Sequence, residues 1–241
     1  MIFLRNDQTY LNANTYVIAD PDKKSALVVD PGAGAHAWVP TALSSRGLTL
    51  GAVLLTHGHA DHVWDAAAVA GSAPVYLAQP DFYRMEDPVF AADATAKLAL
   101  GRMGSSPQWS KPQNLVPLSD ILTTTVEIVP GVYLRGIPAP GHTEGSTVFL
   151  FEGQITPDPE AAMAPTNRET ELFLLAGDVI FNNGIGRTDL AGGDPYVMAA
   201  TLRLLVQSLK SETYIFPGHG PHTTMFQELR YSQFLQHAMR N

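Results

Sequence analysis

The sequence predicts a fold of the α/β or α+β class. Short apolar runs rich in β-branched residues recur along the chain, and longer stretches with helical features separate some of them. The chain has 241 residues, of which 45% are hydrophobic and 16% charged, so it is long enough to bury a sizeable core. Because no internal repeat and no linker divides it, we expect a single domain over residues 1–241.

The expected elements are short and lie in both halves of the chain. The strands cover Asn14–Ala19, Ala26–Asp30, Ala52–Thr56, Val75–Ala78, Val126–Val129, Tyr133–Ile137, Thr147–Glu152, Leu172–Ala176 and Thr213–Phe216. The helices cover His36–Arg46, Asp61–Val69, Pro195–Lys210 and Thr224–Met239. Two stretches fit neither pattern: we expect Asp81–Pro117 to cover the functional site and Gln154–Thr170 to be a surface insertion.

Composition excludes several classes of function. The formal net charge of -8 argues against nucleic acid as a partner, because a surface that neutralises phosphates needs clustered Lys and Arg. Without cysteine, any metal must be bound by His, Asp or Glu, and disulfides and thiolate nucleophiles are excluded. The first seven residues reach charge too early for a signal peptide, and no run approaches the ~18 apolar residues of a membrane span. We therefore expect a cytoplasmic protein with no membrane partner.

The segment 57–62, His-Gly-His-Ala-Asp-His, concentrates potential metal ligands where an expected strand opens into a loop. Residues two apart on an extended chain point to the same side, so His57 and His59 can converge on one ion. Asp61 and His62 stand at an expected helix start, are turned away from that pair, and can serve a second ion. A solvated histidine-rich loop is the alternative, and the density of ligands favours a metal site.

Three later residues extend this pattern: His142 in Pro-Gly-His-Thr, Asp178 in Ala-Gly-Asp and His219 in Pro-Gly-His-Gly. Each follows an expected strand, and the glycine beside it allows a sharp turn that presents the side chain into a cleft. Alone, each is weak evidence, because a single histidine in a turn is usually a surface residue and Asp178 can be a helix cap. Together with the segment 57–62 they indicate a metal centre.

The ordered series THGHADH, PGHT, GD and PGHG resembles the metallo-β-lactamase superfamily, and within it the short bacterial glyoxalase II-like (hydroxyacylglutathione hydrolase-like) enzymes. The resemblance runs from the Asn14 strand and the Asp30-Pro31-Gly32 turn to His219. It implies an αββα sandwich with the site at one edge of the two sheets. It also implies two divalent ions, with one on His57, His59 and His142, the other on Asp61, His62 and His219, and Asp178 bridging them.

Such a site predicts a hydrolase. Two ions can share a water, lower its pKa and polarise a carbonyl, while Asp61 orients the resulting hydroxide as the catalytic residue. Zinc is the expected metal, and iron or manganese also suit these ligands. A small-molecule hydroxyacyl thioester is the preferred substrate, because a thiolate with a thiol pKa of about 8.5 leaves without strong acid assistance.

Other activities stay open at this point. Only residues 221–241 follow the Pro-Gly-His-Gly motif of His219, whereas longer glyoxalase II-like proteins carry a C-terminal helical domain that helps to bind glutathione. Another thiol, or a broader ester or lactone substrate, would suit the same site. A β-lactamase is less favoured, because those enzymes usually lack the bridging carboxylate that Asp178 supplies. A persulfide dioxygenase with one iron on His57, His142 and Asp178 is the main alternative. A non-catalytic binding module is a further one, and the oligomeric state is open.

The remaining polar candidates receive structural interpretations. The segment 184–190 is similar to that of both glyoxalase II-like proteins and persulfide dioxygenases, and we expect Arg187 and Asp189 to form an ion pair that holds this loop. His36, His222 and His237 match none of the ligand motifs, so we expect them on the surface or in loops. His222 lies near His219 in the sequence and retains a possible supporting role.

Overall fold

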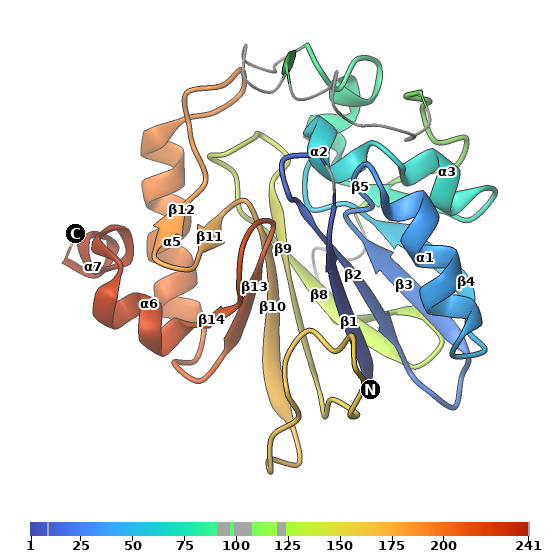
Figure 1. The fold of residues 1–241 in the computed structure, drawn as a ribbon. Helices are drawn as coiled ribbons and strands as arrows, with labels where there is room; N and C mark the ends of the chain where they lie inside the picture. Colours follow the sequence, from blue (N-terminus) through green and yellow to red (C-terminus); the bar gives the residue numbers. More distant parts are fainter. Residues whose placement is uncertain (9, 91–96, 99–107, 120–123, 241) are drawn as a thin grey trace.

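A computed structural model describes residues 1–8, 10–90, 97–98, 108–119 and 124–240. Two six-stranded sheets form the centre of the described part and helices cover their outer faces (Figure 1). This arrangement confirms the expected αββα sandwich. Among the described residues, no helix is long and apolar enough to cross a membrane.

The first sheet has the order β1-β2-β3-β4-β5-β6. Its strands are β1 (Ile2–Asp7), β2 (Asn14–Ala19), β3 (Ser25–Val29), β4 (Thr49–Leu54), β5 (Val75–Leu77) and β6 (Leu115–Pro117). The pairs β1–β2 and β2–β3 are antiparallel. The pairs β3–β4, β4–β5 and β5–β6 are parallel. Since parallel neighbours run in the same direction, β3 and β4 end at the same edge, where Asp30 and the segment 57–62 follow them.

The second sheet has the order β14-β13-β10-β9-β8-β7. Its strands are β7 (Val126–Val129), β8 (Val132–Pro138), β9 (Thr147–Gly153), β10 (Glu171–Gly177), β13 (Tyr214–Pro217) and β14 (Thr223–Thr224). A small hairpin of β11 (Ile180–Phe181) and β12 (Gly184–Ile185) follows β10. Because β10 and β13 are parallel, the residues that follow them, Asp178 and His219, leave the same edge of this sheet.

Most helices lie on the outer faces of the sheets, whereas α2 lies at the edge where the strands end (Figure 1). Near the first sheet are α1 (Ala35–Ser44), α2 (Ala60–Val63), α3 (Ala66–Ala70) and the 3-10 helix η1 (Gln79–Met85). Near the second are α5 (Pro195–Ser208), α6 (Met225–Tyr231) and α7 (Gln233–Arg240). Each outer layer buries its own apolar cluster, and the space between the sheets is filled by a third cluster with Phe3, Phe149, Phe173 and Phe216 at its centre. Burial of these three clusters drives the layers together.

Every predicted strand is present within a few residues of its expected bounds, as are the helices α1 and α5. Strands β1, β6, β11, β12 and β14 were not expected. The predicted helix Asp61–Val69 is two short helices, and Thr224–Met239 is interrupted at Ser232, whose ψ of 119° is extended rather than helical. Of the predicted cover Asp81–Pro117, residues 91–96 and 99–107 lie outside the described residues.

The segment Gln154–Thr170 is more than the surface insertion expected from the sequence. It runs along the edge strand β1, where Arg5 N donates to Glu160 O and Ala162 N donates to Phe3 O. Ala162 and Met163 are buried in the core between the sheets. An edge strand presents unpaired backbone groups, and this segment satisfies part of them while sealing the core. Most of the segment lies on the surface, as expected, but the sequence did not indicate that some of its apolar residues are buried by a partner distant in the sequence.

Candidate metal centre

Four loops at one edge of the sandwich bring the candidate ligands together. The segment 57–62 connects β4 to α2, His142 lies between β8 and β9, Asp178 follows β10, and His219 follows β13. Every candidate except His219 is at most 9% exposed, and the His219 side chain is 27% exposed. The structure therefore brings together all seven residues that the sequence singled out: His57, His59, Asp61, His62, His142, Asp178 and His219.

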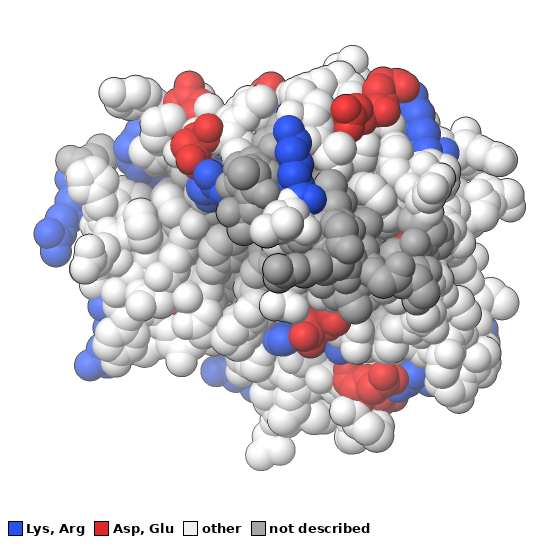
Figure 2. All heavy atoms as spheres, turned by 45° about the horizontal axis from the view of Figure 1, so that its top comes forward, with Lys and Arg blue, Asp and Glu red and all other residues white. Residues whose placement is uncertain are grey.

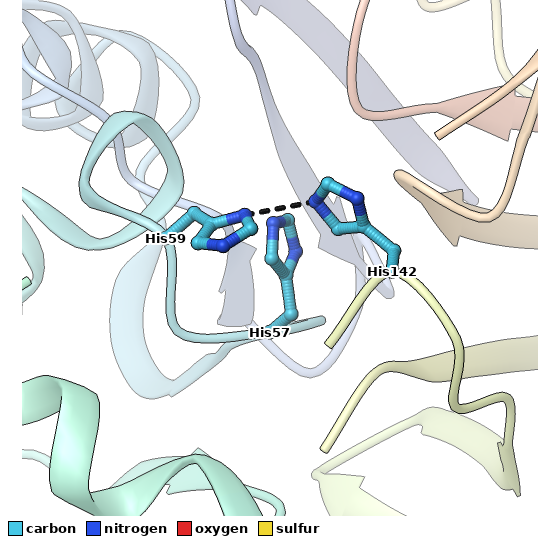
Figure 3. A group of neighbouring side chains, drawn as sticks. All are labelled: His57, His59 and His142. Carbon is cyan, nitrogen blue, oxygen red and sulfur yellow. Dashed lines mark hydrogen bonds between the residues drawn. The ribbon is translucent and has the colours of Figure 1, made fainter. Parts of the chain in front are cut away.

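The first cluster consists of His57, His59 and His142, whose rings face one another (Figure 3). The Nδ1 atom of His59 lies 2.8 Å from Nε2 of His142. One ring nitrogen from each of the three residues lies within 4.8 Å of the others. Three nitrogen donors that converge in this way provide three corners of a metal coordination sphere.

The second cluster consists of Asp61, His62 and His219. Nε2 of His219 lies 3.1 Å from Oδ2 of Asp61 and 3.3 Å from Nε2 of His62. The same Asp61 oxygen lies 3.6 Å from Nε2 of His62. Two nitrogens and one carboxylate oxygen thus converge beside the first cluster.

Asp178 lies between the clusters. Its Oδ1 atom is 3.3 Å from Nε2 of His62, and its Oδ2 atom is 3.5 Å from Nε2 of His219. Oδ2 is also 3.6 Å from Nε2 of His142, which belongs to the first cluster. One carboxylate therefore reaches both groups, as a bridging ligand must.

Asp30 sets the orientation of two histidines. Its Oδ2 atom accepts a hydrogen bond from the Thr56 hydroxyl at 2.6 Å and lies 3.1 Å from Nδ1 of His62. Because the Thr56 hydroxyl donates to Asp30, it is an acceptor for Nδ1 of His57, 3.0 Å away. In the neutral form that can bind a metal, both rings thus carry their proton on Nδ1 and present the lone pair of Nε2 to the centre.

Backbone carbonyls orient two further rings in the same way. Nδ1 of His142 donates to the carbonyl of Arg187 at 2.7 Å, and Nδ1 of His219 donates to the carbonyl of Leu11 at 3.1 Å. His59 is reversed, with Nδ1 directed at the neighbouring ring of His142. Fixed tautomers of this kind are typical of histidines that bind metal.

The polar atoms of the centre fit divalent cations. Nε2 of His57 and Oδ1 of Asp178 are buried and have no hydrogen-bond partner in the described part of the chain. Buried acceptors that face one another repel unless a proton or a cation lies between them. Imidazole nitrogens and carboxylate oxygens are ligands for zinc, iron and manganese. Asp30 lies close enough to be a ligand, but its oxygens already accept hydrogen bonds from Thr56, so it is a support.

The pKa values divide the centre into two halves. Burial and the neighbouring rings lower the pKa of His57, and burial and His142 lower the pKa of His59 to about 3. Burial also lowers the pKa of His219, but the charge of Asp178 and the hydrogen bonds to Asp178 and Asp61 together outweigh it and raise that pKa to about 10. The pKa of His62 is likewise raised, because Asp178 and Asp61 outweigh its burial. Without metal, His57 and His59 are neutral, whereas protons balance the carboxylates of the second cluster.

The turn that carries His219 is held closely against the centre. The Asn14 side-chain amide donates to the carbonyls of Pro217 and Gly220, and the Tyr16 hydroxyl donates to that of Pro217. A Cβ atom added at Gly218 would lie 2.1 Å from Oδ1 of Asp178. Only glycine fits at this position without displacing the carboxylate or the turn.

The other polar candidates lie outside the two clusters. Arg187 and Asp189 form the predicted ion pair, with Nε and Oδ1 2.7 Å apart on an exposed loop. His237 is exposed on α7, and His222 is half-buried against the Phe216 ring. His36 is half-buried rather than a plain surface residue, because its Nδ1 contacts the buried carboxylate of Asp65 at 2.7 Å.

The sequence analysis gave no role in the centre to two of its buried carboxylates. Asp30 belongs to the Asp-Pro-Gly turn after an expected strand, and this signal, the same as for Asp178, would have identified it. Asp81 lies in η1 and contacts both loops of the first cluster. It stands in the stretch expected only as a cover, and nothing in the local pattern distinguishes it.

Comparison with known proteins identifies relatives over nearly the whole chain. An uncharacterised protein of Mycobacterium tuberculosis is 34% identical, over 95% of this chain and 96% of its own length. A Haemophilus influenzae protein named hydroxyacylglutathione hydrolase GloC is 28% identical, over 94% of each chain.

Solved structures share the fold. The BLEG-1 B3 metallo-beta-lactamase superimposes with a TM-score of 0.73 at 30% identity, over 97% of this chain and 99% of its own. A protein crystallised in a di-iron-bound form, TTHA1623, has a TM-score of 0.68 at 30% identity, over 95% and 98% of the two chains. The sequence profile of the metallo-beta-lactamase superfamily matches residues 9–154, more than half of the chain. With this match, the sandwich and the histidine-rich clusters at its edge, the chain belongs to the metallo-β-lactamase superfamily and has candidate sites for divalent metal.

Proposed function

We propose that the protein is a hydrolase of hydroxyacyl thioesters that uses two divalent metal ions. The first cluster would hold one ion and the second cluster would hold the other. Asp178 would bind both ions as a bridging ligand. The observation that carries the proposal is the presence of two complete clusters joined by one carboxylate, with distances of 3.3 to 3.6 Å from Asp178 to rings of both. The 28% identity to a protein named hydroxyacylglutathione hydrolase supports the substrate class.

The residues of the centre would have separate roles in the reaction. When bound, the two ions would activate a water and polarise the substrate carbonyl. Asp61, buried beside His219, is the carboxylate that orients the attacking water and accepts its proton. Asp30 and the two backbone carbonyls keep the rings in one tautomer, so the ligands need little reorganisation during the reaction.

Zinc is the metal we propose, and iron is the first alternative to test. The ligands of both clusters suit either ion: the first cluster has three histidines, and the second has two histidines and one aspartate. The relative crystallised with two irons favours including iron in every assay. The cytoplasmic location and the single-domain organisation stay predictions from the sequence.

The proposed substrate is a small molecule rather than a nucleic acid. On the face shown in Figure 2, Lys and Arg side chains of the described residues are interspersed with Asp and Glu. The whole chain has 15 Lys and Arg against 23 Asp and Glu. A phosphate backbone would need a concentrated positive surface, so these charges favour a small substrate.

One set of assays separates the candidate reactions. Metal-free protein is reconstituted with zinc or with iron and given an S-2-hydroxyacyl thioester of glutathione, the same ester of a simpler thiol, a chromogenic β-lactam, and glutathione persulfide. We expect release of free thiol with two metal ions bound, no β-lactam opening, and no oxygen uptake. Persulfide-dependent oxygen uptake with iron and without thioester cleavage would assign a dioxygenase and refute the proposal. Opening of the β-lactam alone would refute it equally.

A further inference from the structure

A buried carboxylate outside the two clusters is bonded to both loops of the first one. Asp81 in η1 is fully buried. Its Oδ2 atom accepts hydrogen bonds from Gly58 N and from the Thr143 hydroxyl, both at 2.8 Å, and its Oδ1 atom accepts one from Gly145 N at 2.8 Å. Gly58 lies between His57 and His59, and Thr143 directly follows His142. One side chain is therefore bonded next to every member of the first cluster.

These bonds join the two sheets. The loop with Gly58 follows β4 of the first sheet, whereas Thr143 and Gly145 lie between β8 and β9 of the second. The packing is as close as the hydrogen bonding. A Cβ atom added at Gly145 would lie 2.6 Å from Cγ of Asp81, and one added at Gly58 would lie 3.3 Å from its Cβ. Neither loop can shift relative to Asp81 without breaking a hydrogen bond or a contact.

Arg84, one turn later in η1, connects Asp81 to a third segment, the loop that contains Arg187 and Ala191. Its Nε lies 3.4 Å from Oδ1 of Asp81, and its Nη2 donates to the carbonyl of Ala191 at 2.7 Å and to Glu144 at 2.7 Å. The segment before Ala191 contains Arg187, whose carbonyl accepts from Nδ1 of His142. The guanidinium also balances the charge of Asp81 inside the protein, where an unpaired carboxylate would be costly.

The second cluster has different supports. His62 is oriented by Asp30, and the turn of His219 is held by the Leu11 carbonyl and by Asn14. None of the contacts described for Asp81 involves Asp61, His62 or His219.

We propose that Asp81 is a positioning residue for the first cluster: it fixes the spacing between the loop of His57 and His59 and the loop of His142, and so sets the metal affinity of that cluster alone. The inference rests on the proposed function, because it assumes that the cluster binds metal. Residues that orient metal ligands typically change metal affinity by about 10-fold to 100-fold when they are replaced.

The test compares Asp81→Asn with Glu228→Gln. An asparagine keeps the shape, but its amide turns one accepting atom into a donor that faces either Gly145 N or Gly58 N. Glu228 is a matched control, because it is buried and also accepts from a backbone N–H and a threonine hydroxyl, at Asn183 and Thr223. Stepwise zinc affinities are measured by chelator competition. We expect Asp81→Asn to weaken one of the two binding steps about 10-fold to 100-fold, and Glu228→Gln to leave both unchanged.

Two further measurements test the same role of Asp81. If Asp81→Asn does not fold, Thr143→Val replaces it, because it removes one hydrogen bond to Asp81 with little change of shape. We expect Thr143→Val to weaken the same binding step by a smaller factor. In metal-free Asp81→Asn, the ring-nitrogen NMR signals of His59 and His142 should move while that of His219 stays. Unchanged zinc affinities in both variants, or equal weakening of both steps, would overturn the inference. Wild-type protein that binds no metal would instead refute the proposed function.

Discussion

Gly218→Ala tests how closely the centre is packed. An added Cβ would lie 2.1 Å from Oδ1 of Asp178 and 2.6 Å from Cε1 of His62. Ordinary contact between such atoms needs about 3.5 Å, so the carboxylate or the turn must move by more than ~1 Å. Overpacking of this kind typically costs about 1–3 kcal/mol of stability. A displacement of about 1 Å at a reacting group can reduce turnover about 100-fold.

The loss of turnover should therefore exceed what the loss of stability explains. We expect Gly218→Ala to remain folded, with a melting temperature lower by about 2–4 °C for each kcal/mol lost, and to hydrolyse the thioester about 100-fold more slowly. Gly184→Ala is the control, because a Cβ there meets only Phe181 atoms at 3.8 Å or more. Metal content, thermal unfolding and turnover are measured on both variants. Near-normal turnover of Gly218→Ala with two metal ions bound would refute the assignment of Asp178 and His62 to one centre.

Three further predictions concern the metal ions, the pH dependence of metal binding, and the Gln154–Thr170 segment. Asp178→Ala should weaken the binding of both metal ions, whereas His219→Ala should weaken chiefly the binding of one. Elemental analysis after dialysis distinguishes the two variants, and retention of two ions by Asp178→Ala would refute the role of Asp178 as the bridging ligand. Metal affinity should rise with pH towards 10, because the raised pKa of His219, about 10 against a usual 6.5, means that binding displaces a proton. The protonated ring stabilises metal-free protein fully below pH 6.5 and loses this contribution towards pH 10; calorimetry in buffers of different ionisation enthalpy would show no proton release if this is wrong. Arg46→Ala should cost about 1 kcal/mol through loss of the ion pairs with Asp158 and Glu160, with metal content unchanged; destabilisation beyond that would mean the Gln154–Thr170 segment depends on these pairs.

The fold class and the candidate ligands were predictable because their signals are local. Each buried strand is a run of apolar residues, and the segment 57–62 carries four candidate ligands. Strand β1 was missed because its polar end, Arg5 to Asp7, conceals the apolar pattern, and its pairing with β2 is a tertiary event. No proline or glycine marks the break at Ser232. Because the helical periodicity of the sequence continues across this residue, one helix was predicted where the structure has two.

The supports of the centre were harder to predict than the ligands. Asp81 contacts Gly58 across 23 positions of sequence and Gly145 across 64, and it acts on backbone N–H groups that every residue has. A motif identifies a ligand because metal chemistry restricts the residue type and the spacing. A residue that receives backbone hydrogen bonds is restricted only by where the chain passes, and this is known only from the fold.

Asp30 shows how one such support can serve both clusters, and it gives the last prediction. Its carboxylate contacts Nδ1 of His62 at 3.1 Å and, through the Thr56 hydroxyl, the Nδ1 side of His57. Asp30 has a φ of 49°, a conformation that asparagine also adopts readily, so Asp30→Asn should keep the backbone. Its amide cannot accept from Thr56 N, the Thr56 hydroxyl and His62 together. We therefore expect both zinc-binding steps to weaken about 10-fold to 100-fold, unlike the single step affected in Asp81→Asn. If chelator competition shows that only one step is weakened, the hydrogen bonds from Asp30 through the Thr56 hydroxyl do not orient His57.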